Sequence, residues 1–168
     1  MKILFLGDVM GRSGRRAITE RLGVLKSRLK ADFAIVNGEN ASGGTGLTAG
    51  HAKVLLDAGA DCVTLGDHAF DQKDMLAFID TEPRVLRPLN FAREAPGRGH
   101  RVYQDARGRK VLVLQALGQV FMKRPFDDPF SAVDADAHGC GSLRALLGEV
   151  GLSFLKFGGD GCLLYTSD

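Results

Sequence analysis

The pattern that decides the fold occurs three times: ILFLGD at residues 3–8, FAIVNGEN at 33–40 and CVTLGDH at 62–68. Each copy is a short apolar run that ends at glycine, beside an acidic side chain. A short apolar run bounded by turn residues is typical of a strand that is buried on both faces. The sequence therefore predicts buried strands at 2–6, 33–36 and 62–65.

Helical segments separate these strands. After Ser13, a candidate N-cap, a helix is expected to about Lys30, because its apolar residues recur on one helical face. A second helix is expected after Thr48, a suitable N-cap, ending before Gly59. A third is expected at 71–79, followed by a short strand at 85–86 and a hairpin with strands at 101–104 and 110–115. This alternation predicts an α/β fold with a mainly parallel sheet and helices on both faces.

Polar side chains follow each of the three strands. In parallel sheets, ligands bind beyond the carboxyl ends of the strands. Here those ends carry Asp8, then Glu39 and Asn40, then Asp67 and His68. We therefore expect these five side chains to share one edge of the sheet.

The chemistry of this set points to a metal site. Carboxylate and amide oxygens suit a divalent cation of the Mn, Fe or Mg kind, and a histidine beside a carboxylate ligand is well placed to donate a proton. Taken singly, each motif has a plainer interpretation. Asp8 is also a candidate helix cap, residues 37–40 form a turn in any case, and a lone histidine at a strand end is often structural.

Other nucleotide motifs are absent from the sequence. The glycines at 7, 11 and 14 do not form the dinucleotide fingerprint, and the loop at 38–46 lacks the lysine of a P-loop. Glycines in that loop fit either a close approach of backbone to an anion or plain flexibility. His51 is expected on a helix surface and His100 in the hairpin.

Composition limits the class of protein. The 168 residues are 45% apolar and 25% charged, as in a globular domain. Lys and Arg number 22 against 20 Asp and Glu, a net charge of +2 without a basic run, so duplex nucleic acid is not expected as a partner. No apolar run approaches the roughly 20 residues of a membrane span. The three cysteines lack a CxxC spacing, which favours the cytoplasm. The sequence leaves a homo-oligomer open.

Several motifs in fixed order resemble the YmdB-like branch of the calcineurin-like metallophosphoesterases. These are GDVMGRSGR at 7–15, VNGENASGGTGLT at 36–48, GADCVTLGDHAFDQ at 59–72, LRPLNF at 86–91, PGRG at 96–99 and FDDPF at 126–130. The resemblance implies the calcineurin-like fold and hydrolysis of cyclic nucleotides, especially 2′,3′-cyclic ones, at a centre of two divalent ions, iron or manganese.

The resemblance also assigns roles to residues. Asp8 would bind the first metal, Glu39 would bridge both, Asn40 would support the first and Asp67 would bind the second. His68 would be the general acid that protonates the leaving oxygen, while water between the metals attacks phosphorus. The family usually has asparagine where this chain has Asp67. Aspartate can still bind metal and adds one negative charge.

The tail departs from the family pattern. After FDDPF the family continues with an H-x-E motif and later a G-T-H-T-H pair, and this sequence has neither. We therefore expect residues 1–135 to be the N-terminal part of a metallophosphoesterase domain that is incomplete at its C-terminus. Residues 136–168 are expected to be an atypical tail, with a short helix at 143–147, no strand completing the sheet, and poor packing after about Gly139.

Two hypotheses about function follow. The first is a phosphodiesterase acting on cyclic nucleotides, with this chain an incomplete and weakly active or inactive form. The second is a non-catalytic α/β binding module or an inactive fragment. The number of metal ligands distinguishes them, because each metal needs about five or six.

Overall fold

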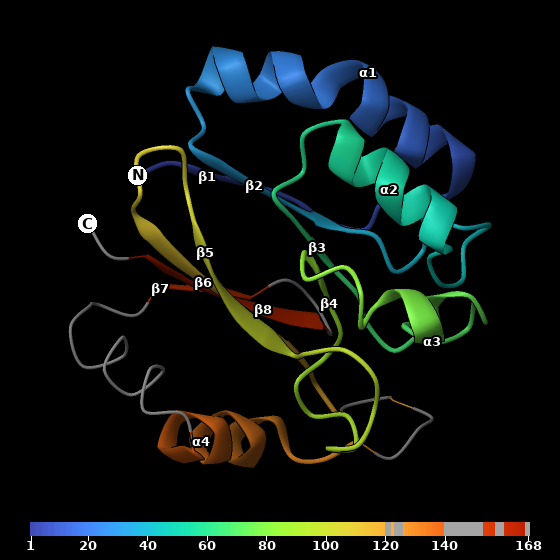
Figure 1. Cartoon of the computed structure of the whole chain (residues 1–168), viewed down its shortest axis with the longest axis vertical. Coiled ribbons are helices and arrows are strands. Elements are labelled where there is room, and N and C mark those ends of the chain that lie inside the picture. The colour runs from blue at the N-terminus through green and yellow to red at the C-terminus, as the bar shows by residue number, and fades with distance from the viewer. Residues whose placement is uncertain (120–121, 123–125, 140–152, 157–159, 167–168) are drawn as a thin grey trace.

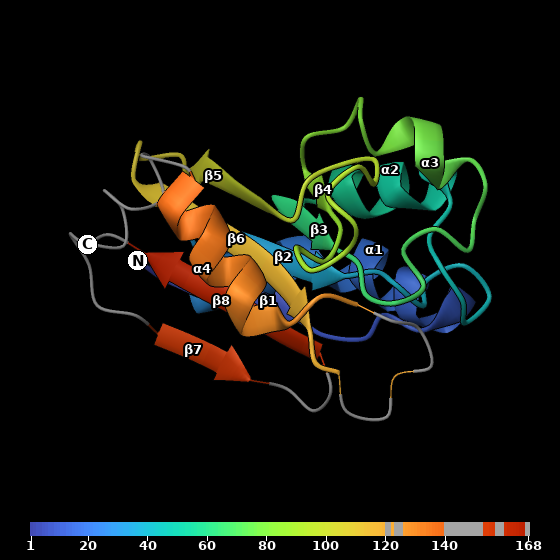
Figure 2. The ribbon, with the colours of Figure 1, turned by 90° about the horizontal axis from the view of Figure 1, so that it is seen from below.

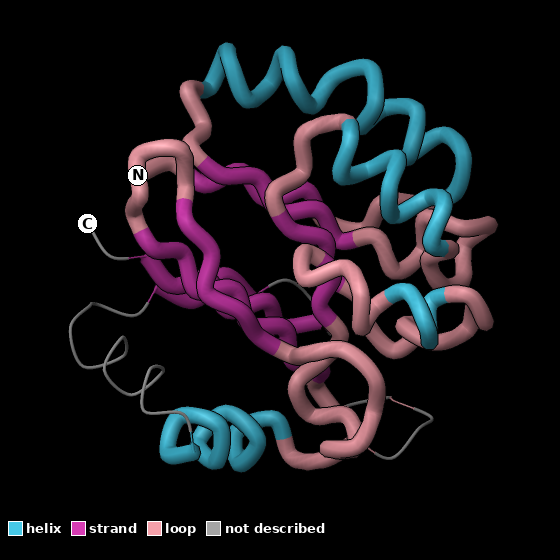
Figure 3. Tube along the Cα trace, viewed as in Figure 1, coloured by secondary structure: helices cyan, strands magenta, loops and turns pink. Residues whose placement is uncertain are grey.

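The structure is a computed structural model that describes residues 1–119, 122, 126–139, 153–156 and 160–166. Figures 1 and 3 show the arrangement of its helices and strands. In chain order the elements are β1 (Ile3–Leu6), α1 (Gly11–Leu29), β2 (Phe33–Asn37), α2 (Ala49–Asp57), β3 (Cys62–Thr64), α3 (Met75–Phe78), β4 (Val85–Leu86), β5 (His100–Gln104), β6 (Lys110–Leu117), α4 (Pro129–Gly139), β7 (Ser153–Lys156) and β8 (Asp160–Thr166). In this described part, no helix is long and apolar enough to cross a membrane.

The first sheet confirms the predicted parallel arrangement. Its strand order is β1-β2-β3-β4, and all three neighbouring pairs are parallel. Strand β2 lies between β1 and β3, with Val36 opposite Leu6 on one side and Val63 on the other. The carboxyl ends of the three strands therefore meet at one edge, as the sequence predicted.

Both faces of this sheet are buried, but by different layers. All five residues of β2 are buried. Ala34 and Val36 belong to the cluster that includes residues of α1 and α2, while Phe33 and Ile35 belong to a second cluster with Val111 of β6 and its neighbours. Alternation along a strand sends successive side chains to opposite faces.

The α/β class is confirmed, but the expected helical layer on the second face is wrong. Helices α1 and α2 lie together on one face, and the second sheet covers the other. Helix α4 lies farther out, on the outer side of that second sheet, in both views (Figures 1 and 2). The apolar inner residues of β6, such as Val111 and Val113, make the second sheet a suitable cover for the first.

The observed start of α1 differs from the expected one, because a contact with a distant loop takes the place of a side-chain cap. Helix α1 begins at Gly11, before the expected Ser13, and the Gly11 N–H donates to the carbonyl of Asn40 at 2.9 Å. Thr48 caps α2 as predicted, accepting from the N–H of His51 at 3.2 Å. Gly59 follows this helix with φ +108°, a conformation that favours glycine. Helix α3 is shorter than the predicted 71–79.

The second sheet contains the hairpin and part of the tail. Its strand order is β5-β6-β8-β7, with antiparallel pairs throughout. The tail does contain strands: β8 pairs with β6 from Val111 to Leu117, but it adds to the second sheet and leaves the parallel sheet at four strands. One physical reason is the free edge of β6, whose backbone groups need partners on the side away from β5. The helix expected at 143–147 lies outside the described residues.

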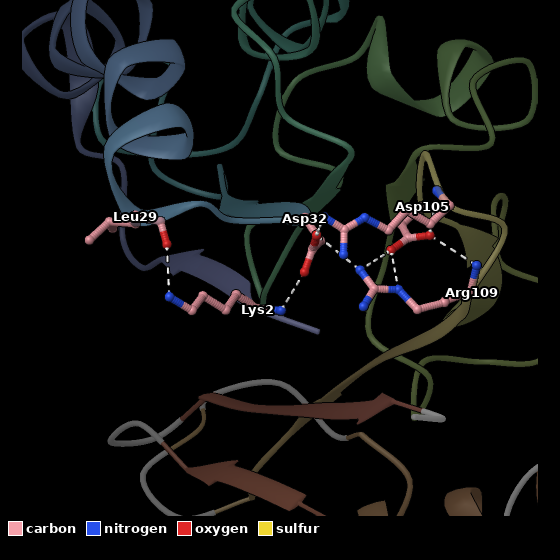
Figure 4. A network of polar contacts seen from close by, with 6 residues as sticks. Lys2, Leu29, Asp32, Asp105 and Arg109 are labelled. Carbon is pink, nitrogen blue, oxygen red and sulfur yellow. Dashed lines mark hydrogen bonds and ion pairs between the residues drawn. The ribbon is translucent and has the colours of Figure 1, made fainter.

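A polar network joins the two sheets at the end opposite the predicted site (Figure 4). Asp32, just before β2, accepts from the N–H of Lys2 at 2.7 Å and forms an ion pair with Arg109 at 2.9 Å. Arg109 also donates to Asp105 Oδ2 from Nε at 2.7 Å, and Asp105 Oδ1 accepts the N–H groups of Arg107 and Arg109, both at 2.9 Å. Burial would raise the pKa of Asp105, but these hydrogen bonds outweigh it and lower the pKa.

The lowered pKa of Asp105 gives a prediction about acid stability. A carboxyl whose pKa is lower in the folded state stabilises the fold above its unfolded pKa of about 3.9, and this contribution is lost as the pH falls through the folded value. We expect Asp105→Asn to lower the thermal midpoint at pH 7 and to flatten its fall below about pH 4. Thermal unfolding measured at pH values from 7 down to below about 4 tests both effects. The substitution Asp57→Asn, at an exposed residue, is the control. A wild-type midpoint and acid profile in Asp105→Asn would contradict the role of this network.

Candidate metal centre

The loops that follow β1 and β2 are joined at the predicted edge. Asp8 follows β1 with φ +45°, an uncommon conformation for a non-glycine residue. The next N–H, of Val9, donates to the carbonyl of Asn37 at 3.0 Å. Asn40 Nδ2 donates to Asp8 Oδ1 at 2.8 Å. The structure therefore brings together two of the predicted oxygen-bearing side chains, Asp8 and Asn40.

Glu39 connects the same edge to the loop after β3. Its side chain is buried, with 4% exposure. A Cβ placed on Gly66 would lie 1.4 Å from Glu39 Oε2 and 2.4 Å from Glu39 Cδ, so the carboxylate occupies the space that a side chain at position 66 would fill. The glycine before Asp67 is thus required by the position of Glu39.

Asp67 and His68 lie half-buried on this loop after β3. Asp67 Oδ2 is 3.9 Å from His68 Nε2. On the other side of the ring, His68 Nδ1 lies 2.5 Å from Asp71 Oδ2. Sequence reasoning missed Asp71, although its spacing of three residues from His68 was a usable signal. Asp71 fixes the ring orientation and leaves Nε2 on the side of Asp67.

The predicted residues have the donor atoms that a metal centre needs, but their side chains do not yet form a closed set of ligands. Asp8, Glu39, Asn40 and Asp67 offer oxygen donors from three neighbouring strand ends, which is the donor type preferred by manganese and magnesium. Within the residues described, no three His, Cys, Asp or Glu side chains form a ready metal-binding group. The contacts found are the hydrogen bond between Asn40 and Asp8 and the packing of Glu39 against Gly66, next to Asp67.

The glycine-rich loop at 42–48 packs against the segment that carries His68. Gln72 Nε2 donates to the carbonyl of Thr45 at 2.8 Å. A Cβ on Gly46, where φ is +77°, would lie 3.2 Å from the carbonyl oxygen of His68. Gly46 therefore permits close packing of two backbone segments, and flexibility alone does not explain it.

His51 is not the plain helix-surface residue that the sequence suggested. It is half-buried, and its Nδ1 lies 2.6 Å from Ser42 Oγ in the glycine-rich loop. Burial lowers the pKa of His51, the charge of Arg15 lowers it further, and Asp74 acts in the opposite direction. The hydrogen bond between His51 Nδ1 and Ser42 Oγ helps to anchor the loop to α2.

A substitution at Gly66 tests the placement of Glu39. We expect Gly66→Ala to displace the Glu39 carboxylate and to weaken Mn²⁺ binding at least about tenfold, in the range that supporting residues of metal sites show. Gly50→Ala is the matched control, because nothing lies within 4 Å of a Cβ at that helical position. Titration of Mn²⁺ into both variants measures the difference. Wild-type affinity in Gly66→Ala would show that Glu39 is not a ligand.

The fold and the site together define a class of protein. A solved phosphatase from Mycoplasma pneumoniae superposes with a TM-score of 0.74 and 33% sequence identity, covering 83% of this chain and 51% of that one. The fold is therefore that of phosphatases of the metallophosphoesterase type. The chain belongs to the YmdB-like protein family, whose model matches residues 4–146. This confirms the resemblance found in the sequence.

Other similar proteins agree with this placement. A Bacillus subtilis protein named 2′,3′-cyclic-nucleotide 2′-phosphodiesterase is 42% identical over 134 residues, which are 80% of this chain and 50% of that protein. The crystal structure of a hypothetical protein from Thermus thermophilus gives a TM-score of 0.75 at 40% identity, covering 82% of this chain and 53% of the other. The chain thus spans about half the length of the curated relatives it matches.

Proposed function

We propose that this sequence is the N-terminal half of a metal-dependent phosphodiesterase that hydrolyses 2′,3′-cyclic nucleotides. The activity in the name of the Bacillus subtilis relative supports the substrate class. The observation that carries the proposal is the joining of three strand ends, through the Asn40–Asp8 hydrogen bond and the packing of Glu39 over Gly66. Contact between the three loops that carry the proposed ligands supports the proposal.

Asp8, Glu39, Asn40 and Asp67 are the proposed metal ligands. Glu39 has two carboxylate oxygens and follows β2, which lies between β1 and β3, so it is the proposed bridge between two ions, iron or manganese. Such ions would supply positive charge that polarises the phosphate and lowers the pKa of water. Asp67, where the family usually has asparagine, adds negative charge and is expected to tighten metal binding.

His68 is the proposed general acid, and Asp71 its positioning residue. The contact with Asp71 occupies His68 Nδ1, and Nε2 lies 3.9 Å from Oδ2 of the proposed ligand Asp67. When water attacks phosphorus, the bond from phosphorus to O2′ breaks, and the proton on Nε2 moves to O2′. The attacking water gives its hydroxyl to phosphorus and releases one proton to solvent. The products are a nucleoside 3′-phosphate and a neutral histidine, which regains a proton from solvent.

The alternative is a non-catalytic module or an inactive fragment, and a full-length version separates the two. Joining residues 1–135 to the second half of the Bacillus subtilis relative provides one. We expect this fusion to convert 2′,3′-cyclic AMP to the 3′-phosphate with Mn²⁺, and to lose activity with a chelator. We expect the 168-residue chain, measured beside it, to be much less active. A fusion that binds Mn²⁺ without hydrolysing the substrate would favour the non-catalytic alternative.

The remaining parts of the proposal concern surroundings and partners. We propose that the protein works in the cytoplasm on a small substrate, without a membrane or duplex nucleic acid as a partner. The cysteine pattern and the balanced charge of the sequence support this. A homo-oligomer stays a prediction, and light scattering of the purified chain measures it directly.

A further inference from the structure

Three polar side chains lie in the apolar layer between the two sheets. Asn37, Thr64 and Gln115 are 6%, 0% and 1% exposed. The oxygens Asn37 Oδ1, Thr64 Oγ1 and Gln115 Oε1 are fully buried, and within the described part of the chain they have no hydrogen-bond partner. A buried oxygen without a partner is costly, and native proteins contain few of them.

Strand alternation puts all three side chains on the same side of their sheets. Asn37 follows Ile35 by two residues in β2, and Gln115 follows Val113 by two residues in β6. Thr64 likewise follows Cys62 in β3. Ile35, Val113 and Cys62 all belong to the cluster that fills the space between the sheets. Because side chains two residues apart share a face, the three oxygens enter that same space.

The three side chains also lie at the same end of the layer. Asn37 and Thr64 are register partners in the first sheet. At the start of β2, the Phe33 ring lies 5.5 Å from the ring of Tyr103, the residue that pairs with Val111 in β6.

Strands β2 and β6 both continue beyond this contact. Four residues further along they reach Asn37 in β2 and Gln115 in β6. A second contact lies at this end of β6: the N–H of Leu89 donates to the Gln115 carbonyl at 2.7 Å, and Leu89 is three residues after Leu86, which pairs with Thr64.

We propose that these three oxygens bind one buried water molecule between the sheets. The backbone carbonyls of the three residues already accept N–H groups, from Val9, Gly38 and Leu89. The side-chain oxygens are therefore the groups that need a hydrogen-bond partner. The two amide oxygens only accept, whereas the Thr64 hydroxyl also donates.

One water satisfies all three oxygens. It donates its two hydrogens to Asn37 and Gln115 and accepts from Thr64, which is the usual number of bonds for a buried water. Three neutral oxygens are too few, and carry too little charge, for a divalent cation. This inference rests on the fold alone and does not depend on the proposed activity.

The sign of a stability change tests the proposal. With the water present, Thr64→Val removes one of its three partners, and we expect the unfolding equilibrium constant to rise at least about fivefold. Thr64→Ser keeps the hydroxyl and serves as the control that retains the water. Without the water, Thr64→Val would remove an oxygen that has no partner, and stability would increase. An increase in stability therefore overturns the proposal.

A direct count of bound water complements the stability measurement. Oxygen-17 magnetic relaxation of the solvent detects water molecules that stay inside the protein for longer than nanoseconds. We expect one such molecule fewer in a Thr64→Val and Gln115→Met double variant than in the wild-type chain. If the double variant does not fold, the stability comparison of Thr64→Val with Thr64→Ser decides alone. An equal count of long-lived water in the folded variant and the wild type overturns the proposal.

Discussion

Replacement of His68 by alanine in the full-length fusion is expected to slow hydrolysis of 2′,3′-cyclic AMP by about 10²- to 10⁴-fold, the usual loss when a general acid is removed. The alkoxide at O2′ is a poor leaving group and needs the proton that His68 Nε2 donates. Nitrophenolate leaves without a proton, so the loss with a nitrophenyl phosphodiester is expected to be much smaller. Rates on both substrates, with metal content measured in each preparation, test this division of roles.

The general-acid role has two clear ways to fail. Loss of metal in His68→Ala would make His68 a ligand, and equal slowing of both substrates would exclude proton donation to the leaving group. Asp71→Asn refines the test, because it keeps the size of the side chain that contacts His68 Nδ1. It is expected to lower the rate on the poor leaving group and to shift the pH profile, without loss of metal.

Replacement of Glu39 by alanine is expected to abolish binding of both metals and all metal-dependent activity. A bridging ligand serves two ions at once, so its loss should exceed the roughly 10- to 100-fold weakening that supporting residues show. Metal analysis after dialysis measures the effect in the 168-residue chain and in the fusion. Glu39→Gln, which keeps the shape of the buried side chain, is the matched variant and should also lose metal.

Folding and metal binding must be separated for this variant, since Glu39 is buried. Circular dichroism shows whether Glu39→Ala retains the α/β fold. A folded Glu39→Ala or Glu39→Gln chain that keeps two metal ions would exclude Glu39 as the bridge. A folded chain that keeps one ion would make Glu39 a ligand of a single metal.

The parallel sheet was predictable because each of its strands carries its own local signal. The buried runs that end near Leu6, Val36 and Leu65 alternate with helices, and parallel pairing then follows from the need for crossover connections. The position of the candidate residues followed in turn, because strand ends of a parallel sheet share an edge. The ends of α2 were predictable for the same reason, because each depends on a nearby residue: Thr48 caps its start and Gly59 follows its end.

Features that depend on distant contacts were not predictable in this way. The cover on the second face of the first sheet comes from β5 and β6, and a hairpin's sequence does not say which surface it packs on. Helix α1 starts before Ser13 because the carbonyl of Asn40 accepts the Gly11 N–H. The packing of Glu39 over Gly66 joins residues 27 positions apart in a parallel register, which no local pattern encodes.

The most direct test of the proposed metal centre is an NMR titration of the 168-residue chain with Mn²⁺, which broadens signals near its binding site. The account predicts that amide signals of Asp8, of Glu39 and Asn40, and of Asp67 disappear first. It also predicts that signals of the Asp105–Arg109 turn, at the opposite end of the sheets, persist. Saturable broadening centred elsewhere, or none at the three strand ends, would contradict it.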